Sequence, residues 1–229
     1  YEGQEIGAEG PTGLITYMRT DSTRVAESAV AQAREYISRH FDRRYLPDTP
    51  NQPRARKSQS RVQDAHEAIR PTDVRRRPED VKPYLESDLF KLYQLVWRRF
   101  VASQMNPEVY ELTTVDFDLG RYLFRATGSV VLFDGYRMLY HEGHEPEEGK
   151  SADELAPIPA LVAGDRVTVR QITPGQHFTE PPPRYSEASL VKKLEELGIG
   201  RPSTYATIIS TLQQRWYATP RARRFSPTP

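Results

Sequence analysis

The chain has 229 residues, with 32 basic and 31 acidic side chains and a formal net charge of +1. It contains no cysteine, which excludes disulfide bonds, cysteine-based zinc sites and a cysteine nucleophile. No apolar run is long enough to span a bilayer and no secretory signal pattern is found, so we expect a soluble intracellular protein without membrane partners. The chain opens with Tyr1 rather than methionine, which suggests a piece of a longer protein.

The charge is divided unevenly along the chain. Residues 1–99 carry 18 basic and 15 acidic side chains, residues 100–180 carry 6 and 13, and residues 181–229 carry 8 and 3. An acidic middle between two basic ends suggests that a polyanion is bound by the flanks and avoided by the centre. The C-terminal part is the better candidate for contacts with phosphate groups.

Two helices are predicted in the N-terminal part. Apolar residues recur at helical spacing from Val25 to Ile37, and Asp21-Ser22-Thr23 just upstream supplies oxygens that can cap this helix. Residues 47–63 are rich in Pro, Gln, Ser and Arg, as is typical of an exposed loop. A second helix is predicted from about Glu86 to Gln104, and its buried face comprises Leu89, Leu92, Tyr93, Val96, Trp97 and Phe100.

The middle part is predicted to be rich in β-structure. Turn signals occur at Leu119-Gly120, at Thr127-Gly128-Ser129 and at Gly164-Asp165. Between and around these turns the pattern predicts four strands, from Val109 to Asp118, Arg121 to Ala126, Val130 to Leu139 and Arg166 to Ile172.

The C-terminal part is predicted to hold two helices and a basic tail. Ser186 can cap the first helix, whose apolar face is followed by Gly198 as a closing residue. Pro202 suits the first turn of the second helix, which continues through Leu212. Because a basic run of Arg221, Arg223 and Arg224 follows, this part also fits a winged-helix reader of DNA. A non-catalytic DNA-binding module is therefore an alternative function.

The segment from Gly13 to Ser22 carries a candidate nucleophile, Tyr17. A phenol is a weak nucleophile because its ordinary pKa is about 10. Arg19 is always charged and can bind phosphate through two donors. On an extended strand, residues 17 and 19 point to the same face, so both can reach one phosphate. The alternative is an ordinary half-buried strand tyrosine beside a surface arginine.

His66 and Arg70 form a second candidate site. A histidine near a scissile phosphate can donate a hydrogen bond or share a proton, and Arg70 can contact phosphate. The alternative is a solvated or structurally bonded histidine. A metalloprotease site is excluded because His-Glu-Ala-Ile-Arg lacks the second histidine one helical turn on.

A third candidate site lies between the two C-terminal helices. Gly200-Arg201-Pro202-Ser203-Thr204 begins a helix, whose free N–H groups can bind a phosphate together with Arg201. A plain capped turn between two packed helices is the alternative.

Three stretches in this order resemble the motifs of the type IA DNA topoisomerases, most closely the bacterial members. They are GLITYMRTDS from Gly13, AHEAIRP from Ala65, and PRYSEA from Pro183 running on to GRPSTY from Gly200. The resemblance implies an α+β multidomain fold. Its expected parts are a mainly helical domain with the active-site tyrosine (residues 1–107), a β-rich arch domain (108–178) and the start of a helical DNA-binding domain (179–229).

The resemblance also implies a reaction. Tyr17, assisted by Arg19, would cleave single-stranded DNA through a 5′-phosphotyrosyl intermediate and religate it, which relaxes negative supercoils without ATP. Trp216 departs from the glycine that the family commonly has before the tyrosine of its Arg-Gly-Tyr, and this weakens any inference beyond Arg215. The implied DNA contacts are His66, Arg70, Arg201, Ser203, Thr204 and Arg215.

In the family, Mg²⁺ is bound by a Toprim domain that lies before the first motif and is absent from this sequence. We therefore expect this chain alone to be inactive, with no cofactor and no metal site of its own. Asp116 and Asp118 match the start of the family's Asp-x-Asp-x-Glu cluster, but Gly120 stands where the third carboxylate should be. The implied partners are single-stranded DNA and negatively supercoiled duplex DNA. The implied state is a monomer in the bacterial cytoplasm, associated with the nucleoid.

Overall fold

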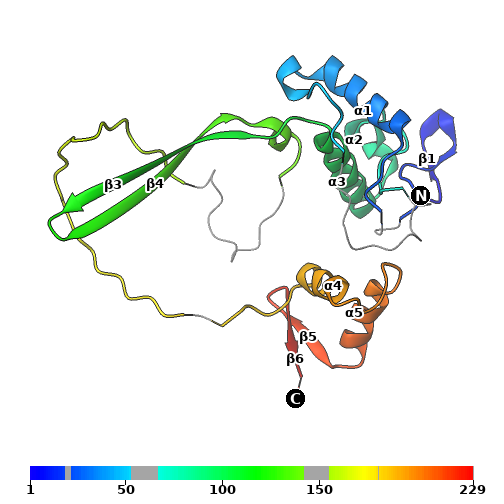
Figure 1. The fold of residues 1–229 in the computed structure, drawn as a ribbon. Helices are drawn as coiled ribbons and strands as arrows, with labels where there is room; N and C mark the ends of the chain where they lie inside the picture. The colour runs from blue at the N-terminus through cyan, green and yellow to red at the C-terminus, as the bar shows by residue number, and fades with distance from the viewer. Residues whose placement is uncertain (19–21, 53–66, 142–154, 180, 229) are drawn as a thin grey trace. The chain divides into compact units, whose positions relative to one another are not determined.

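A computed structural model describes residues 1–18, 22–52, 67–141, 155–179 and 181–228 (Figure 1). The chain divides into two compact units, Tyr1–Ile158 and Pro159–Pro229. Helices and strands occur together, which confirms the expected α+β content. The boundary expected after residue 107 lies inside the first unit, and the three-domain division stays a prediction. No helix of the described residues is long and apolar enough to cross a membrane.

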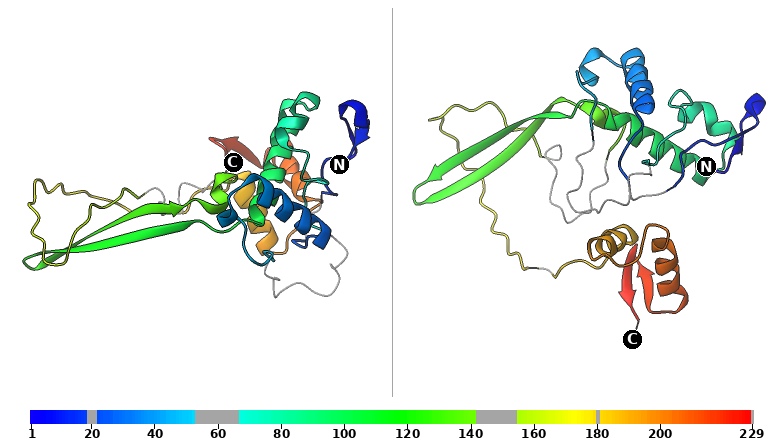
Figure 2. Two further views of the ribbon diagram at one scale, coloured as in Figure 1. Left: turned by 90° about the horizontal axis from the view of Figure 1, so that it is seen from above. Right: turned by 45° about the vertical axis from the view of Figure 1, so that its right-hand side comes forward.

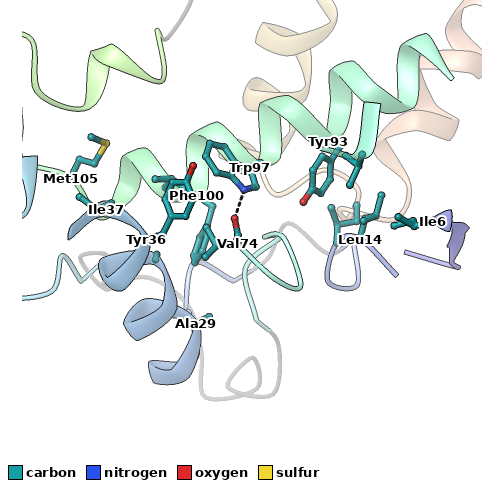
Figure 3. Packing of buried hydrophobic residues seen from close by; sticks show 14 residues of the cluster. Ile6, Leu14, Ala29, Tyr36, Ile37, Val74, Tyr93, Trp97, Phe100 and Met105 are labelled. Atoms are coloured by element: carbon teal, nitrogen blue, oxygen red, sulfur yellow. Dashed lines mark hydrogen bonds between the residues drawn. The ribbon is translucent and has the colours of Figure 1, made fainter. Parts of the chain in front are cut away.

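The core of the first unit is built by two helices, α1 (Glu27–His40) and α3 (Ser87–Ser103), with the short α2 (Pro78–Val81) beside α3 (Figure 3). The rings of Tyr36 and Trp97 meet edge to face at 5.3 Å between centroids. The indole N–H of Trp97 donates to the carbonyl oxygen of Val74 at 2.9 Å. Because buried aromatic rings contribute large apolar areas, the contact between Tyr36 and Trp97 anchors α1 to α3.

Both predicted helices form, but the start of α1 and the buried face of α3 differ from the prediction. The helix expected from Val25 begins at Glu27, and its N-cap Ala26 has no capping side chain of its own. In α3, Tyr93, Trp97 and Phe100 are buried as predicted, but Leu89 and Leu92 are 42% and 43% exposed. Because Tyr93, the residue after Leu92, is 3% exposed, the buried face of α3 is narrower than predicted.

Short elements surround these helices. Strands β1 (Gln4–Glu5) and β2 (Pro11–Thr12) form an antiparallel pair. The single-turn 3₁₀ helices are η1 (Gly7–Glu9), η2 (Arg43–Tyr45), η3 (Lys82–Tyr84) and η4 (Gly135–Met138).

The β-rich part is one long hairpin, formed by β3 (Val109–Leu119) and β4 (Tyr122–Phe133) (Figure 1). The turn predicted at Leu119-Gly120 is confirmed, since Gly120 has a φ of 63° in a two-residue connection. The turn predicted at Gly128 is wrong, because Gly128 pairs with Thr113 inside the ladder. The strands predicted from Arg121 to Ala126 and from Val130 to Leu139 are therefore one strand, which ends at Phe133, and residues 135–138 form a 3₁₀ turn instead of strand. The strand predicted from Arg166 to Ile172 does not form; this segment is exposed and outside any sheet.

The root of the hairpin is bonded to the helical part of the first unit. The hydroxyl of Tyr45 donates to Asp134 at 2.7 Å, and its ring lies 4.9 Å from that of Phe133. Asn106 donates through its side chain to the carbonyl oxygen of Arg44 at 2.7 Å. The hairpin and the helices are therefore joined by a packed junction.

The second unit contains α4 (Glu187–Glu196), α5 (Tyr205–Gln214) and a hairpin of β5 (Ala218–Arg221) and β6 (Arg224–Pro227) (Figure 2). The predicted cap is confirmed, because Ser186 forms a reciprocal capping box with Ser189. Gly198 closes α4 with a φ of 68°. The second helix begins at Tyr205 rather than at Pro202, since residues 202–204 form a turn.

Candidate active site

The first and second sequence motifs lie side by side in the first unit. The N–H of Thr16 donates to the carbonyl oxygen of Arg70, and the N–H of Thr72 to that of Leu14, both at 2.9 Å. Ile15 and Pro71 form an isolated antiparallel bridge between these bonds. The strand expected to hold Tyr17 is thus reduced to a short pairing that ends before the tyrosine.

The hydroxyl of Thr16 strengthens this pairing. It accepts a hydrogen bond from the N–H of Arg70 at 3.0 Å and donates one to the carbonyl oxygen of Ala68 at 3.0 Å. One side chain thus satisfies two backbone groups of the facing segment, which holds the residue before Tyr17 in place.

Tyr17 itself is accessible. The residue is 58% exposed, and its ring meets that of Tyr1 edge to face at 5.2 Å between centroids. The phenol is therefore not enclosed in the apolar core. Arg19 and His66, the predicted partners of Tyr17, both lie outside the described residues.

Arg70 lies directly beside this strand pairing and is firmly held. Its Nε and Nη2 donate to the two carboxylate oxygens of Glu67 at 2.7 and 3.1 Å, and Nη1 donates to the carbonyl oxygen of Pro71 at 2.9 Å. The side chains of Arg70 and Glu67 are 13% and 28% exposed. A guanidinium has five N–H donors, so two remain without a partner among the described residues.

Glu67 has a role that the sequence analysis missed. Its Oε1 accepts a hydrogen bond from the N–H of Ala26 at 2.8 Å, so it caps α1 from a distant part of the chain. Burial raises the pKa of Glu67. The hydrogen bonds from Arg70 and Ala26 together lower it by more than burial raises it, so the pKa lies below its usual value. A carboxylate close to His66 in the second motif was the available signal, but its partner at the start of α1 could not be read from sequence.

The third candidate site lies in the second unit. The side-chain oxygen of Thr204 accepts from the N–H of Arg201 at 2.9 Å and donates to its carbonyl oxygen at 3.0 Å. Arg201, Ser203, Thr204 and Arg215 are all exposed. Gly200 precedes this turn with a φ of 78°, and a Cβ there would lie 2.9 Å from Ile208. The positive φ therefore favours glycine here, whereas the Ile208 methyl group is the end of a flexible side chain that can shift.

Arg215 is the C-cap of α5, and Trp216 follows it. The N–H of Trp216 donates to the carbonyl oxygen of Gln213 at 3.0 Å, and that of Tyr217 to Leu212 at 2.9 Å. Trp216 has a φ of 57° and is 70% exposed. The departure from glycine at this position therefore places a large side chain on a left-handed backbone.

Asp116 is engaged in an ion pair across the long hairpin. Arg125, its partner in the ladder, donates to both carboxylate oxygens at 2.7 and 2.9 Å. The hydrogen bond from Arg125 lowers the pKa of Asp116. In the parts of the chain that the structure describes, no group of three or more His, Cys, Asp or Glu side chains could hold a metal ion.

Comparisons with known proteins agree over the full length of the chain. Residues 1–229 match the DNA topoisomerase family. The sequence is 47% identical, over all of its 229 residues, to DNA topoisomerase 1 of Xylella fastidiosa, from strain Temecula1 and from strain 9a5c. It covers 28% of each of those proteins. Full-length topoisomerase I from Thermotoga maritima superposes with a TM-score of 0.74 at 37% identity, over all of this chain and 35% of that one.

Proposed function

The chain belongs to the DNA topoisomerase family, and on that premise we propose that it is the tyrosine-bearing portion of a type IA enzyme. It spans about 28% of the length of its curated relatives, so the activity proposed is that of the whole protein. The observation that carries the proposal is an exposed Tyr17 fixed through Thr16 to the Arg70 segment. An accessible phenol on a segment that is held in place by its neighbour suits attack on a phosphodiester.

The proposed step is a transesterification. The phenolic oxygen of Tyr17 forms a bond to phosphorus while the bond from phosphorus to the 3′ oxygen of the strand breaks. The phenol loses its proton and the leaving oxygen gains one, which gives a 5′-phosphotyrosyl ester and a free 3′-hydroxyl. The reverse reaction closes the strand after another strand has passed. Because the ester retains the bond energy, ATP is not consumed.

Cationic side chains would stabilise the charge that develops on the phosphate. We assign this role to Arg19, and DNA contacts to His66 and Arg70 in the first unit. Preorganised donors of this kind contribute about 3–4 kcal/mol to transition-state stabilisation in a sheltered site. In the second unit the proposed contacts are Arg201, Ser203, Thr204 and Arg215.

Magnesium belongs, in this proposal, to the part of the enzyme that precedes the tyrosine motif. The described residues do not offer the cluster of carboxylates that a hard cation needs. On the resemblance to the family, we expect the 229-residue chain alone to fail to relax supercoiled plasmid in a magnesium-containing buffer. Robust relaxation by this chain would overturn that expectation.

The decisive test of the nucleophile uses the full-length enzyme. Tyr17→Phe removes the hydroxyl and should abolish the covalent protein–DNA adduct trapped by denaturation on a labelled single strand. Tyr1→Phe is the matched control, because Tyr1 contacts the Tyr17 ring. Removal of the Tyr1 hydroxyl should leave adduct formation unchanged. An adduct that persists in Tyr17→Phe would identify another nucleophile.

The winged-helix alternative is favoured by one observation, the order α4, α5, β5, β6 in the second unit. A titration of the chain with single-stranded and duplex oligonucleotides separates the two functions. The topoisomerase proposal expects a preference for single strands and affinity that falls with salt. A preference for one duplex sequence would support the winged-helix module. We further propose a monomer in the bacterial cytoplasm.

A further inference from the structure

Trp216 occupies a backbone position that disfavours it. Its φ of 57° is in the left-handed region, where a bulky side chain is an outlier and glycine is unstrained. Two backbone hydrogen bonds at the end of α5, and a third from the N–H of Thr228 to Tyr217 at 3.2 Å, impose this conformation. The turn therefore requires a left-handed residue here, but nothing in it requires tryptophan.

Packing among the described residues of this chain does not explain the tryptophan either. The residue is 70% exposed, the most of any described Phe, Tyr or Trp apart from Phe178. A large apolar ring left in water on a strained backbone contributes little to the stability of the fold. Residues held in unfavourable backbone conformations are concentrated at active sites and ligand-binding sites.

The surroundings of the indole indicate the ligand. Arg215 precedes it and is exposed, and Tyr217, which follows it, is 58% exposed. The segment 181–229 carries 8 basic and 3 acidic residues. Exposed aromatic rings among cations are the arrangement that binds single-stranded nucleic acid, because bases stack on the rings while cations contact the phosphates.

We propose that the indole of Trp216 is a stacking platform for one unpaired base of a single DNA strand. The inference rests on the proposed DNA-binding function and deepens it, by adding a base contact to the phosphate contacts expected of Arg201 and Arg215. Because every base has a π-face, this contact is tolerant of sequence.

In Trp216→Gly, the stability of the fold and the affinity for single-stranded DNA should not fall together. Glycine suits the left-handed turn, so the midpoint of urea unfolding should be equal or higher. The affinity of the 229-residue chain for a short oligo-dT strand should fall roughly tenfold or more, which is the contribution of one stacked base. Trp216→Phe, which keeps a ring, should lose less.

Ala222→Gly is the matched control. Ala222 has a φ of 49° in the turn between β5 and β6, so glycine relieves the same kind of backbone strain without removing a ring. This variant should bind oligo-dT as the parent chain does. An abasic strand of the same length is the second control, because it keeps the phosphates and removes the stacking partner. Trp216→Gly should not weaken binding to it further.

Fluorescence reports the contact directly. The chain has two tryptophans, and the other, Trp97, is 4% exposed in the first unit. Saturation with oligo-dT should quench the parent chain and protect it from acrylamide, and both changes should vanish in Trp216→Phe. Equal oligo-dT affinity in the parent and Trp216→Gly would overturn the inference, as would an equal loss on the abasic strand. A parent chain that binds no single strand at all would contradict the proposed function itself.

Discussion

The side-chain oxygen of Thr16 accepts a hydrogen bond from the backbone N–H of Arg70 at 3.0 Å. Through this bond, and one donated to Ala68, the residue before the proposed nucleophile is fixed to the segment that carries the Arg70–Glu67 ion pair. The relationship spans 54 positions in sequence. It makes Thr16 a positioning residue, because it acts through the placement of Tyr17.

Thr16→Val keeps the shape of the side chain and leaves the N–H of Arg70 and the carbonyl oxygen of Ala68 without this partner. We expect the free energy of unfolding to fall by about 1–3 kcal/mol, measured by urea denaturation of the 229-residue chain. In the full-length enzyme, single-turnover adduct formation should slow more than DNA binding weakens. Thr16→Ser retains the hydroxyl and should restore both quantities, whereas a valine variant with normal adduct formation would refute the positioning role.

The Glu67–Arg70 pair predicts a pH dependence of stability. The pKa of Glu67 is lower in the folded chain than in the unfolded chain, where it is about 4.3. The unfolded state therefore takes up a proton first as the pH falls. The stabilisation is fully present above about pH 4.3 and is lost as the pH drops through the lower folded value.

Glu67→Gln removes the charge and should lower the free energy of unfolding at neutral pH by about 1–3 kcal/mol. The difference from the parent chain should shrink in urea titrations carried from neutral pH down through the acidic range. Glu35→Gln is the control, because the Glu35–Arg39 pair is exposed and such pairs contribute little. A constant difference between parent and Glu67→Gln at every pH would contradict the assignment.

Gly135 should not tolerate a side chain. Its φ is 52°, and a Cβ would lie 2.4–2.5 Å from backbone atoms of Pro107 and Glu108 at the root of the hairpin. Gly135→Ala should therefore destabilise the first unit by more than the roughly 1–2 kcal/mol of left-handed strain alone. Gly120→Ala isolates that strain, since Gly120 has a φ of 63° and nothing within 4 Å of a Cβ. Equal thermal shifts for the two variants would show that the root can relax.

Trp97 joins α3 to the segment before α2 through a buried hydrogen bond to Val74. Trp97→Phe leaves that carbonyl oxygen without its donor and opens a small cavity, so we expect a loss of about 2–4 kcal/mol on urea unfolding. Trp216→Phe, at an exposed position, should change stability by less than about 0.5 kcal/mol. A similar small effect at Trp97 would mean that the core there repacks.

Local sequence patterns were sufficient where neighbouring residues decide the structure. Helical periodicity identified α1 and α3, Ser186 identified the start of α4, and Gly120 identified the tip of the long hairpin. They failed where a local signal was overridden. Gly128 was read as a turn residue, yet its backbone continues the ladder opposite Thr113, because pairing along the whole strand outweighs one glycine.

The candidate site divides in the same way. The three motifs and their residue types are properties of the sequence, and their order was enough to indicate the family. Arg19 and His66 remain predictions, as do the assigned DNA contacts. The sequence analysis predicted a phosphate contact for Arg70. It did not anticipate that Glu67 holds the Arg70 guanidinium and also caps α1.

The sequence by itself determined the candidate nucleophile, the helix periods, the hairpin turn at Gly120 and the family, because each depends on residue identity or on spacing within a few positions. Only the tertiary structure decided that Tyr17 is exposed, that Thr16 binds the Arg70 segment, and that Trp216 has a left-handed backbone. Those features arise from contacts between distant segments and from the path of the backbone through a turn, and no local pattern encodes them.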